Sequence, residues 1–285
     1  MSFKTILTPV EGYGDQRFIV ETALFMARKY GSYIEGMHIR PEIIGAIGTD
    51  AMGATIFAEN FSREEWEAVQ KARTLFFDVM REHDVPLCAT TDQPMDGVHA
   101  AWMEEVPSGD MFIGNHGRAF DLLVCGQPSQ EGPAPRLRTL EAALLESGRP
   151  ILLAHDPAPK EFGRRIVIAW NGSTETARAL ADAKPLLHAA DSVHVLVVEE
   201  AMVPGPSGRD VQLYLKRNGI EAELVETRRR KGQGPGETML SETHRLGGDL
   251  MIKGAYTQSR LRQMIFGGAT SFLIANADLP MLMAH

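Results

Sequence analysis

The chain repeats one short pattern that strongly limits the folds open to it. Asp121–Gly126 (DLLVCG) parallels Asp249–Gly254 (DLMIKG): in each stretch an acidic residue precedes a mainly apolar run that ends in glycine. Such a run is typical of a buried parallel strand that turns out of a sheet at the glycine. Internal repetition at this scale indicates two copies of one structural unit. The sequence therefore predicts two similar α/β domains.

The other expected elements recur in the same order in both copies. In the first copy we expect strands at 5–10, 33–39, 87–90, 121–126 and 150–154, and helices at 17–30, at 63–83 and from 99–106. In the second copy we expect strands at 165–172, 192–198, 222–226, 249–254 and 280–284, and helices at 174–189, 210–218, 237–246 and 269–277. Alternation of strands and helices predicts a mostly parallel sheet flanked by helices in each copy.

The proline-rich, polar segment Asp156–Gly163 has the composition of a linker. Domains are therefore expected at 1–156 and 163–285. The first copy is longer than the second, and its extra residues follow Pro41. They comprise Glu42–Asn60, which is rich in small residues, and a longer helix at Arg63–His83.

Composition bounds the class of protein. Of 285 residues, 44% are hydrophobic and 23% charged, as in soluble globular proteins. A net charge of −8 argues against general nucleic-acid binding. No apolar run approaches the length of a membrane span and no signal peptide is evident, so a cytoplasmic protein is expected. Cys88 and Cys125 have neither metal-ligand nor redox spacing, and Cys125 is expected to be buried.

The last stretch of the chain carries a family resemblance. Gly254 is followed by Thr257, then by nine residues, Gly267 and Gly268. The stretch resembles the C-terminal third of a universal stress protein domain, whose nucleotide-binding members carry Gly, two residues, Gly, nine residues, Gly, and Ser or Thr. The outer glycines match, whereas Thr257 replaces the middle glycine and Gly268 the hydroxyl residue. The resemblance covers nearly the whole chain, which is identified as a tandem member with two UspA-like, Rossmann-like domains.

The resemblance implies a nucleotide site in the second copy. Ligands of doubly wound sheets bind beyond the carboxyl ends of the strands, where bare glycine N–H groups can meet phosphates. Asn171 stands where the family usually has an aspartate that contacts the nucleoside. The candidate nucleotide-binding residues are Asn171, Gly254, Thr257, Ser259, Arg260, Gly267, Gly268 and Thr270. The alternative is that these glycines only make turns and pack the helix on the sheet.

The first copy departs further from the family pattern. Pro133 and Pro135 stand where the glycines are expected, and proline lacks the N–H donor that a phosphate needs. Glu11 occupies the usual aspartate position. We therefore expect no ATP in the first copy.

The resemblance implies a stress-response regulatory or binding module, with ATP or AMP in the second copy and Mg²⁺ if the ligand is ATP. The alternatives are a nucleotide-independent sensor or scaffold, and a weak ATPase. The sequence contains no P-loop lysine motif, no nucleophile elbow and no paired zinc ligands, so no catalytic residue and no metal site is assigned. Whether the chain is an enzyme stays open, with a binding role favoured.

Three further expectations concern surfaces. The apolar strands Pro150–Ala154 and Pro280–Ala284 are expected to pair within the chain, which would cover two exposed edges, and a homodimer is possible. The basic run Arg228–Lys231 leaves the ligand edge and is either a solvated loop or a contact for polyphosphate or an acidic partner. His116 and His244 are expected at helix ends, where the helix dipole favours them. No membrane or nucleic-acid partner is expected.

Overall fold

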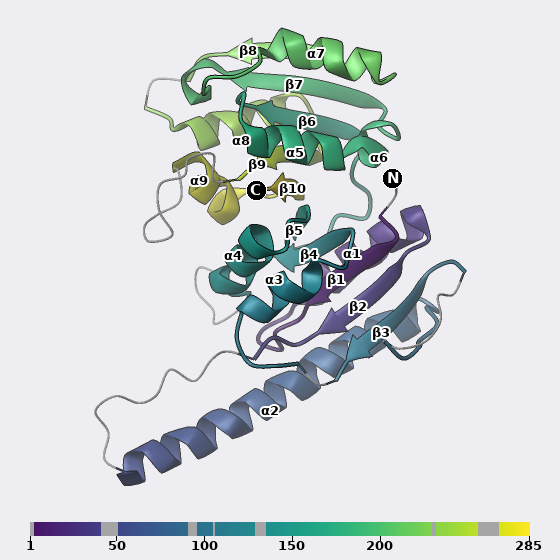
Figure 1. Ribbon diagram of the computed structural model, residues 1–285, viewed down its shortest axis with the longest axis vertical. Helices are drawn as coiled ribbons and strands as arrows, with labels where there is room; N and C mark the ends of the chain where they lie inside the picture. Colours follow the sequence, from purple (N-terminus) through teal and green to yellow (C-terminus); the bar gives the residue numbers. More distant parts are fainter. Residues whose placement is uncertain are drawn as a thin grey trace. The chain divides into compact units, whose positions relative to one another are not determined.

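The computed structural model describes residues 3–40, 51–90, 96–104, 106–128, 135–229, 232–255 and 268–285, with the backbone alone for 51–62. The chain divides into two compact units, Phe3–Ser147 and Gly148–His285. We call them the first unit and the second unit. Each has a mainly parallel sheet flanked by helices, as the alternation in the sequence predicted (Figure 1). The domain limits 1–156 and 163–285 stay a prediction.

The sheet of the first unit has the order β3-β2-β1-β4, and every pairing in it is parallel. Its strands are β1 (Thr5–Pro9), β2 (Tyr33–Met37), β3 (His99–Met103) and β4 (Leu122–Gly126). Its helices are α1 (Arg17–Tyr30), α2 (Ala51–Glu82), α3 (Met111–Gly117) and α4 (Leu137–Glu146). All five residues of β4 are buried, as a strand covered on both faces requires.

The third strand of the first unit lies later in the chain than predicted. We expected a strand at Leu87–Thr90 and a helix from His99–Val106, and both expectations are wrong: His99–Met103 is β3, paired with β2. Leu87 makes only an isolated bridge to Ala100. The helix was expected by correspondence with the second copy. Burial favours a strand instead, because the Trp102 ring packs against Phe76 of α2.

Helix α2 begins twelve residues before the predicted start at Arg63. The stretch Glu42–Asn60 was expected only to be an insertion rich in small residues. Gly53 does not prevent a helix there, because one glycine costs a helix only about 1 kcal/mol. The later half of α2 packs on the sheet through residues such as Phe76 and Met80, which are fully buried. The helix extends well beyond the edge of its own sheet (Figure 1).

The sheet of the second unit has the order β5-β10-β9-β6-β7-β8. Its strands are β5 (Ile151–Ala154), β6 (Arg165–Trp170), β7 (Ser192–Val198), β8 (Glu223–Thr227), β9 (Leu250–Gly254) and β10 (Met281–Ala284). The pairing of β5 with β10 is antiparallel, with Leu152 opposite Leu282. The predicted pairing of the two last strands within the chain is therefore confirmed.

The helices of the second unit are α5 (Thr174–Asp182), α6 (Lys184–Leu187), the 3₁₀ turn η1 (Glu199–Ala201), α7 (Gly208–Arg217), α8 (Pro235–Arg245) and α9 (Gly268–Asn276). The single helix expected at 174–189 is interrupted at Ala183, because Pro185 cannot continue a helix from the preceding turn. A capping box between Ser207 and Asp210 fixes the start of α7.

Two neighbouring residues of β9 show which helices cover which face of this sheet. The Lys253 side chain reaches Thr270 of α9. A Cβ atom on Gly254 would lie 2.3 Å from the backbone nitrogen of Thr176 in α5. Because successive residues of a strand point to opposite faces, α5 and α9 cover opposite faces of the second unit's sheet.

Candidate functional site

The carboxyl end of β6 leads into a loop organised by Asn171. The Asn171 Oδ1 atom accepts hydrogen bonds from Thr176 Oγ1 at 2.6 Å and from the Ser173 backbone N–H at 3.2 Å. Ser173 in turn caps α5 by accepting from the Thr176 backbone N–H at 3.2 Å. Gly172 holds φ at 82°, a left-handed conformation that suits glycine. The amide oxygen of Asn171 therefore shapes the start of α5.

Gly254 lies at the carboxyl end of β9, beside this loop. Any side chain at Gly254 would collide with α5, because its Cβ atom would lie 2.6 Å from Thr176 Oγ1 and 2.3 Å from the Thr176 backbone nitrogen. Glycine at this position therefore lets α5 pack closely on the sheet. It also brings Asn171, through Thr176, to the end of β9.

The first turn of α9 contains the two other predicted site residues that the structure describes. Gly268 is exposed, and a Cβ atom built on it would meet no atom of the described residues within 4 Å. Thr270 is buried, and its Oγ1 atom accepts a hydrogen bond from Lys253 Nζ at 2.9 Å. The backbone at the start of α9 is thus open to the surroundings at Gly268, whereas the hydroxyl two residues later is tied to the sheet.

Lys253 is the residue of this site that the sequence analysis missed. Its side chain is buried, and Nζ also donates to the Gly254 carbonyl oxygen at 2.8 Å. Burial lowers the pKa of Lys253 to about 8. The signal was present in the sequence, because Lys253 is the one charged residue within the buried run that follows Asp249. Lys253 connects Gly254 with Thr270 and so joins the carboxyl end of β9 to the start of α9.

Four predicted site residues, Thr257, Ser259, Arg260 and Gly267, lie outside the described residues. Of the basic run Arg228–Lys231, the structure describes Arg228 and Arg229. The Arg228 side chain is 79% exposed and pairs with Glu199 at 2.7 Å, while the backbone N–H of Arg229 donates to Glu200 at 2.9 Å. These two residues thus contact the neighbouring η1 turn.

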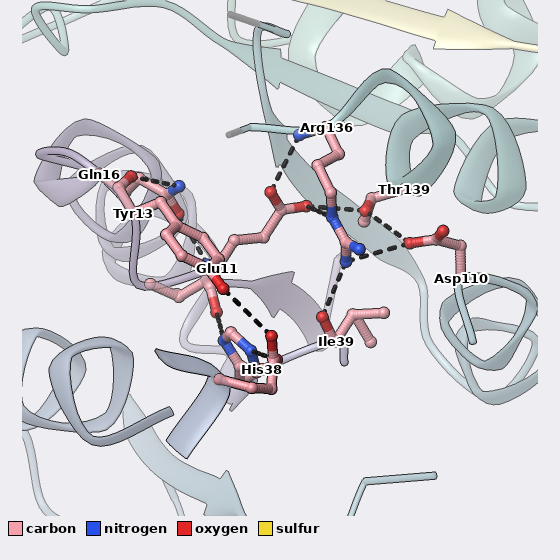
Figure 2. Close-up of polar contacts among 10 residues, drawn as sticks. Glu11, Tyr13, Gln16, His38, Ile39, Asp110, Arg136 and Thr139 are labelled. Atoms are coloured by element: carbon pink, nitrogen blue, oxygen red, sulfur yellow. Dashed lines mark hydrogen bonds and ion pairs between the residues drawn. The ribbon is translucent and has the colours of Figure 1, made fainter. Parts of the chain in front are cut away.

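The corresponding position of the first unit is filled by its own side chains (Figure 2). Glu11, directly after β1, is buried and accepts from the Arg136 backbone N–H at 2.9 Å and from Thr139 Oγ1 at 2.7 Å. The Arg136 guanidinium lies 3.4 Å from Glu11 and 3.1 Å from Asp110, and it donates to the Ile39 carbonyl oxygen at 2.7 Å. We call Glu11, Asp110, Arg136 and Thr139 the first-unit cluster.

Electrostatics in the first-unit cluster follow from burial. Loss of hydration raises the pKa of Glu11, although Arg136 and the hydrogen bond from Thr139 oppose the rise. The cavity that Glu11, Arg136 and Thr139 help to line measures only about 10 Å³. That is about the space of a single water molecule, whereas small-molecule sites usually span hundreds of Å³. This part of the first unit has no room for a nucleotide.

A second buried group adjoins the first-unit cluster (Figure 2). His38 follows β2, and its Nε2 atom lies 2.6 Å from Glu65 of α2, while Nδ1 donates to the Val10 carbonyl oxygen at 3.0 Å. Tyr13 donates to the other Glu65 oxygen at 3.1 Å. Burial and the Glu65 charge raise the pKa of Tyr13 to about 12, so the phenol stays protonated. These contacts fasten α2 to the loop after β1.

The two recurrent histidines lie in the last turns of α3 and α8, as predicted. Each also contacts a carboxylate: His116 lies 2.6 Å from Glu35, and His244 lies 2.7 Å from Asp278. Among the described residues, no three histidine, cysteine or acidic side chains gather as a metal site would require. Cys125 is buried, as predicted. No helix in the described ranges combines the length and apolar character needed to cross a membrane.

Comparison with known proteins places the second half of the chain. Residues 163–285 match the Universal stress protein family. The second half of the chain is a universal stress protein domain. A short segment of the chain is also 33% identical, over 49 residues, to the stress response protein NhaX of Bacillus subtilis. That match spans 17% of this chain and 30% of the relative.

Solved structures extend the likeness in fold to both units. A universal stress protein from Archaeoglobus fulgidus matches 99% of this chain and 97% of its own, with a TM-score of 0.68 and 15% identity. A protein of unknown function from Pseudomonas aeruginosa PAO1 matches 99% of this chain and 92% of its own, with a TM-score of 0.56 and 13% identity. The first unit is therefore included in a likeness of fold that covers nearly the whole chain.

Proposed function

We propose that the chain is a cytoplasmic stress-response module that binds ATP or AMP in its second unit, with Mg²⁺ accompanying ATP. The observation that carries the proposal is the contrast between the units. At the start of α9, Gly268 presents open backbone and a buried hydroxyl and ammonium lie nearby. At the corresponding end of β1, Glu11 and Arg136 occupy the space themselves.

The chemistry of the second unit is compatible with a nucleotide. Unpaired N–H groups and the dipole at a helix N-terminus favour phosphate, and α9 begins at the exposed Gly268. Asn171, at the end of β6, carries both a donor and an acceptor, which suits a base or a ribose. We assign the remaining phosphate contacts to Thr257, Ser259, Arg260 and Gly267, on the strength of the family pattern alone.

The rival proposal is a nucleotide-independent sensor or scaffold. One observation favours it: close packing against Thr176 is a sufficient reason for glycine at position 254 without any phosphate. A weak ATPase has less support, because no described side chain stands out as a base for an attacking water. We also propose that any homodimer uses a surface other than the last strands, because β10 already pairs with β9 and β5.

Native mass spectrometry tests the proposal. The intact chain is measured without added nucleotide and then titrated with ATP and Mg²⁺, alongside Gly268→Val. The Cβ atom of the valine would meet no atom within 4 Å in the part of the chain that the structure describes, so we expect the fold to be kept while the approach of a phosphate is blocked. Ala189→Val is the matched control, since Ala189 is exposed and precedes the amino end of β7, whereas Gly254 lies at the carboxyl end of the parallel strand β9.

We expect a mass increase equal to one adenine nucleotide in the parent and in the Ala189→Val chain, and none in Gly268→Val. Absence of binding at millimolar ATP in the parent chain would refute the nucleotide proposal and leave the sensor or scaffold. Equal binding by Gly268→Val would move the nucleotide away from the start of α9.

A further inference from the structure

The ammonium group of Lys253 is buried with only neutral partners among the described residues. Its two acceptors are the Gly254 carbonyl oxygen and Thr270 Oγ1, at 2.8 and 2.9 Å. No carboxylate in the described ranges acts on its charge, because burial is the one cause of its lowered pKa, although buried charges are normally paired. An ammonium group has three donors, and the described residues accept from two.

The surroundings of this ammonium add to its need for an anion. Thr270 lies in the first turn of α9, so Lys253 Nζ lies beside the helix end that carries a partial positive charge. In that turn, Ser271 Oγ is also buried without a hydrogen-bond partner in the described part of the chain. Buried polar atoms left unpaired by the protein often have a ligand, ion or water as partner.

Charge therefore accumulates here with one sign. The buried ammonium and the start of α9 are both positive, and none of the described residues covers the backbone at Gly268. The lowered pKa of Lys253 expresses the cost of holding that charge away from water. A multiply charged anion bound at this end of α9 would offset both contributions, whereas an uncharged ligand would offset neither.

We propose that Lys253 determines the ligand specificity of the second unit. Its ammonium group interacts with the charge of the phosphate groups, so that the site prefers nucleotides over nucleosides. The inference rests on the proposed nucleotide function and deepens it. Neutral contacts, Asn171 among them, hold the nucleoside portion. Lys253 supplies the discrimination between adenosine, AMP and ATP.

Isothermal titration of adenosine, AMP and ATP, with Mg²⁺ in excess, tests the proposal on the full chain and on Lys253→Met. Methionine keeps the length and apolar stem of lysine without its charge. Lys216→Met is the matched control, because the Lys216 side chain on α7 is 68% exposed and forms only a long ion pair with Glu221, at 3.8 Å. Thermal melting of all three chains shows whether the fold is intact.

We expect Lys253→Met to weaken ATP at least about tenfold, the effect of one charge-assisted hydrogen bond, and to leave adenosine within about twofold. ATP affinity of the parent chain should also fall as the pH rises through about 8, where the ammonium loses its proton. The same titration with Lys253→Met should show no such fall. Lys216→Met should behave as the parent.

The outcomes separate this inference from the function on which it rests. If the parent binds no ATP at millimolar concentration, the nucleotide proposal fails and this inference fails with it. If the parent binds ATP but Lys253→Met loses adenosine and ATP equally, or loses neither, the nucleotide proposal stands and the role of Lys253 is refuted.

Discussion

The buried Lys253 makes the stability of the second unit depend on pH in a way that one substitution can isolate. Burial lowers the pKa of Lys253 to about 8, from an ordinary value of 10.5. In the unfolded chain the ammonium keeps its proton up to the higher value, so between these limits the unfolded state binds more protons. Stability must therefore rise with pH across this window.

The magnitude follows from the two pKa values. The full gap corresponds to about 3 kcal/mol, at about 1.4 kcal/mol for each pH unit. Between about pH 7.5 and pH 9.5 the linkage relation gives a rise of about 2 kcal/mol in the free energy of unfolding. Lys253→Met removes this contribution and leaves the other titrating groups in place, so the difference between the two chains isolates it.

Urea unfolding without nucleotide at both pH values provides the assay. Trp170 is buried in the second unit and donates to the Pro206 carbonyl oxygen at 2.9 Å. In a Trp66→Phe, Trp102→Phe background its fluorescence reports that unit. We expect the parent to gain about 2 kcal/mol more than Lys253→Met as the pH rises. Parallel pH dependence in the two chains would show that Lys253 is solvated or paired, and would refute the reasoning.

Further predictions concern the first unit. Arg136→Met should lower the free energy of unfolding in urea by about 3 kcal/mol, because it leaves the buried Glu11 carboxylate without its cation. Adding Glu11→Gln should recover part of this stability. A double variant no more stable than Arg136→Met would contradict the pairing. Burial raises the pKa of Glu65, but the opposing effect of His38 and Tyr13 is larger, so the pKa of Glu65 is below its usual value of 4.5. The ionised Glu65 therefore stabilises the fold above about pH 4.5, and this contribution is lost on acidification. In acid titrations followed by circular dichroism, the stability difference between the parent and Glu65→Gln should shrink as the pH falls below about 4.5. A constant difference would argue against the His38 contact. Gly12→Ala should cost at least about 2 kcal/mol more than Gly14→Ala, by thermal melting: both residues have positive φ, but only at Gly12 would the new Cβ collide, 1.9 Å from the Ala68 carbonyl oxygen. Equal losses would show that α2 yields at this contact.

Elements whose pattern is local were predicted well from the sequence. Helix α1 covers the expected residues, because the sequence shows both its apolar spacing and the glycine that ends it, Gly31, which takes a left-handed conformation in the structure. Strand β7 also matches, since a short run with four valines is typical of a strand. Strand β3 was missed because its burial depends on a contact between residues distant in sequence, the packing of Trp102 on Phe76 of α2.

The candidate site shows the same division. The ends of β6 and β9 were located from motif positions, and the structure joins them through Thr176, a residue that no motif includes. The first-unit cluster was also not foreseen. Glu11 and Arg136 are 125 positions apart, and nothing local to either residue indicates that the other neutralises it. The prolines, from which no ATP was expected in the first copy, gave no indication of this cluster.

The antiparallel pairing of β5 with β10 has a consequence for how this protein can be divided. The family match begins at residue 163, but the compact second unit begins at Gly148. A fragment cut at the start of the family match would lose Ile151–Ala154 and expose the entirely apolar edge of β10. Such an edge recruits any strand available, including that of another copy. A fragment that begins at Gly148 would keep β5, which covers the edge of β10. A fragment that begins fifteen residues later would lack β5, and we expect it to aggregate or to form an artificial dimer.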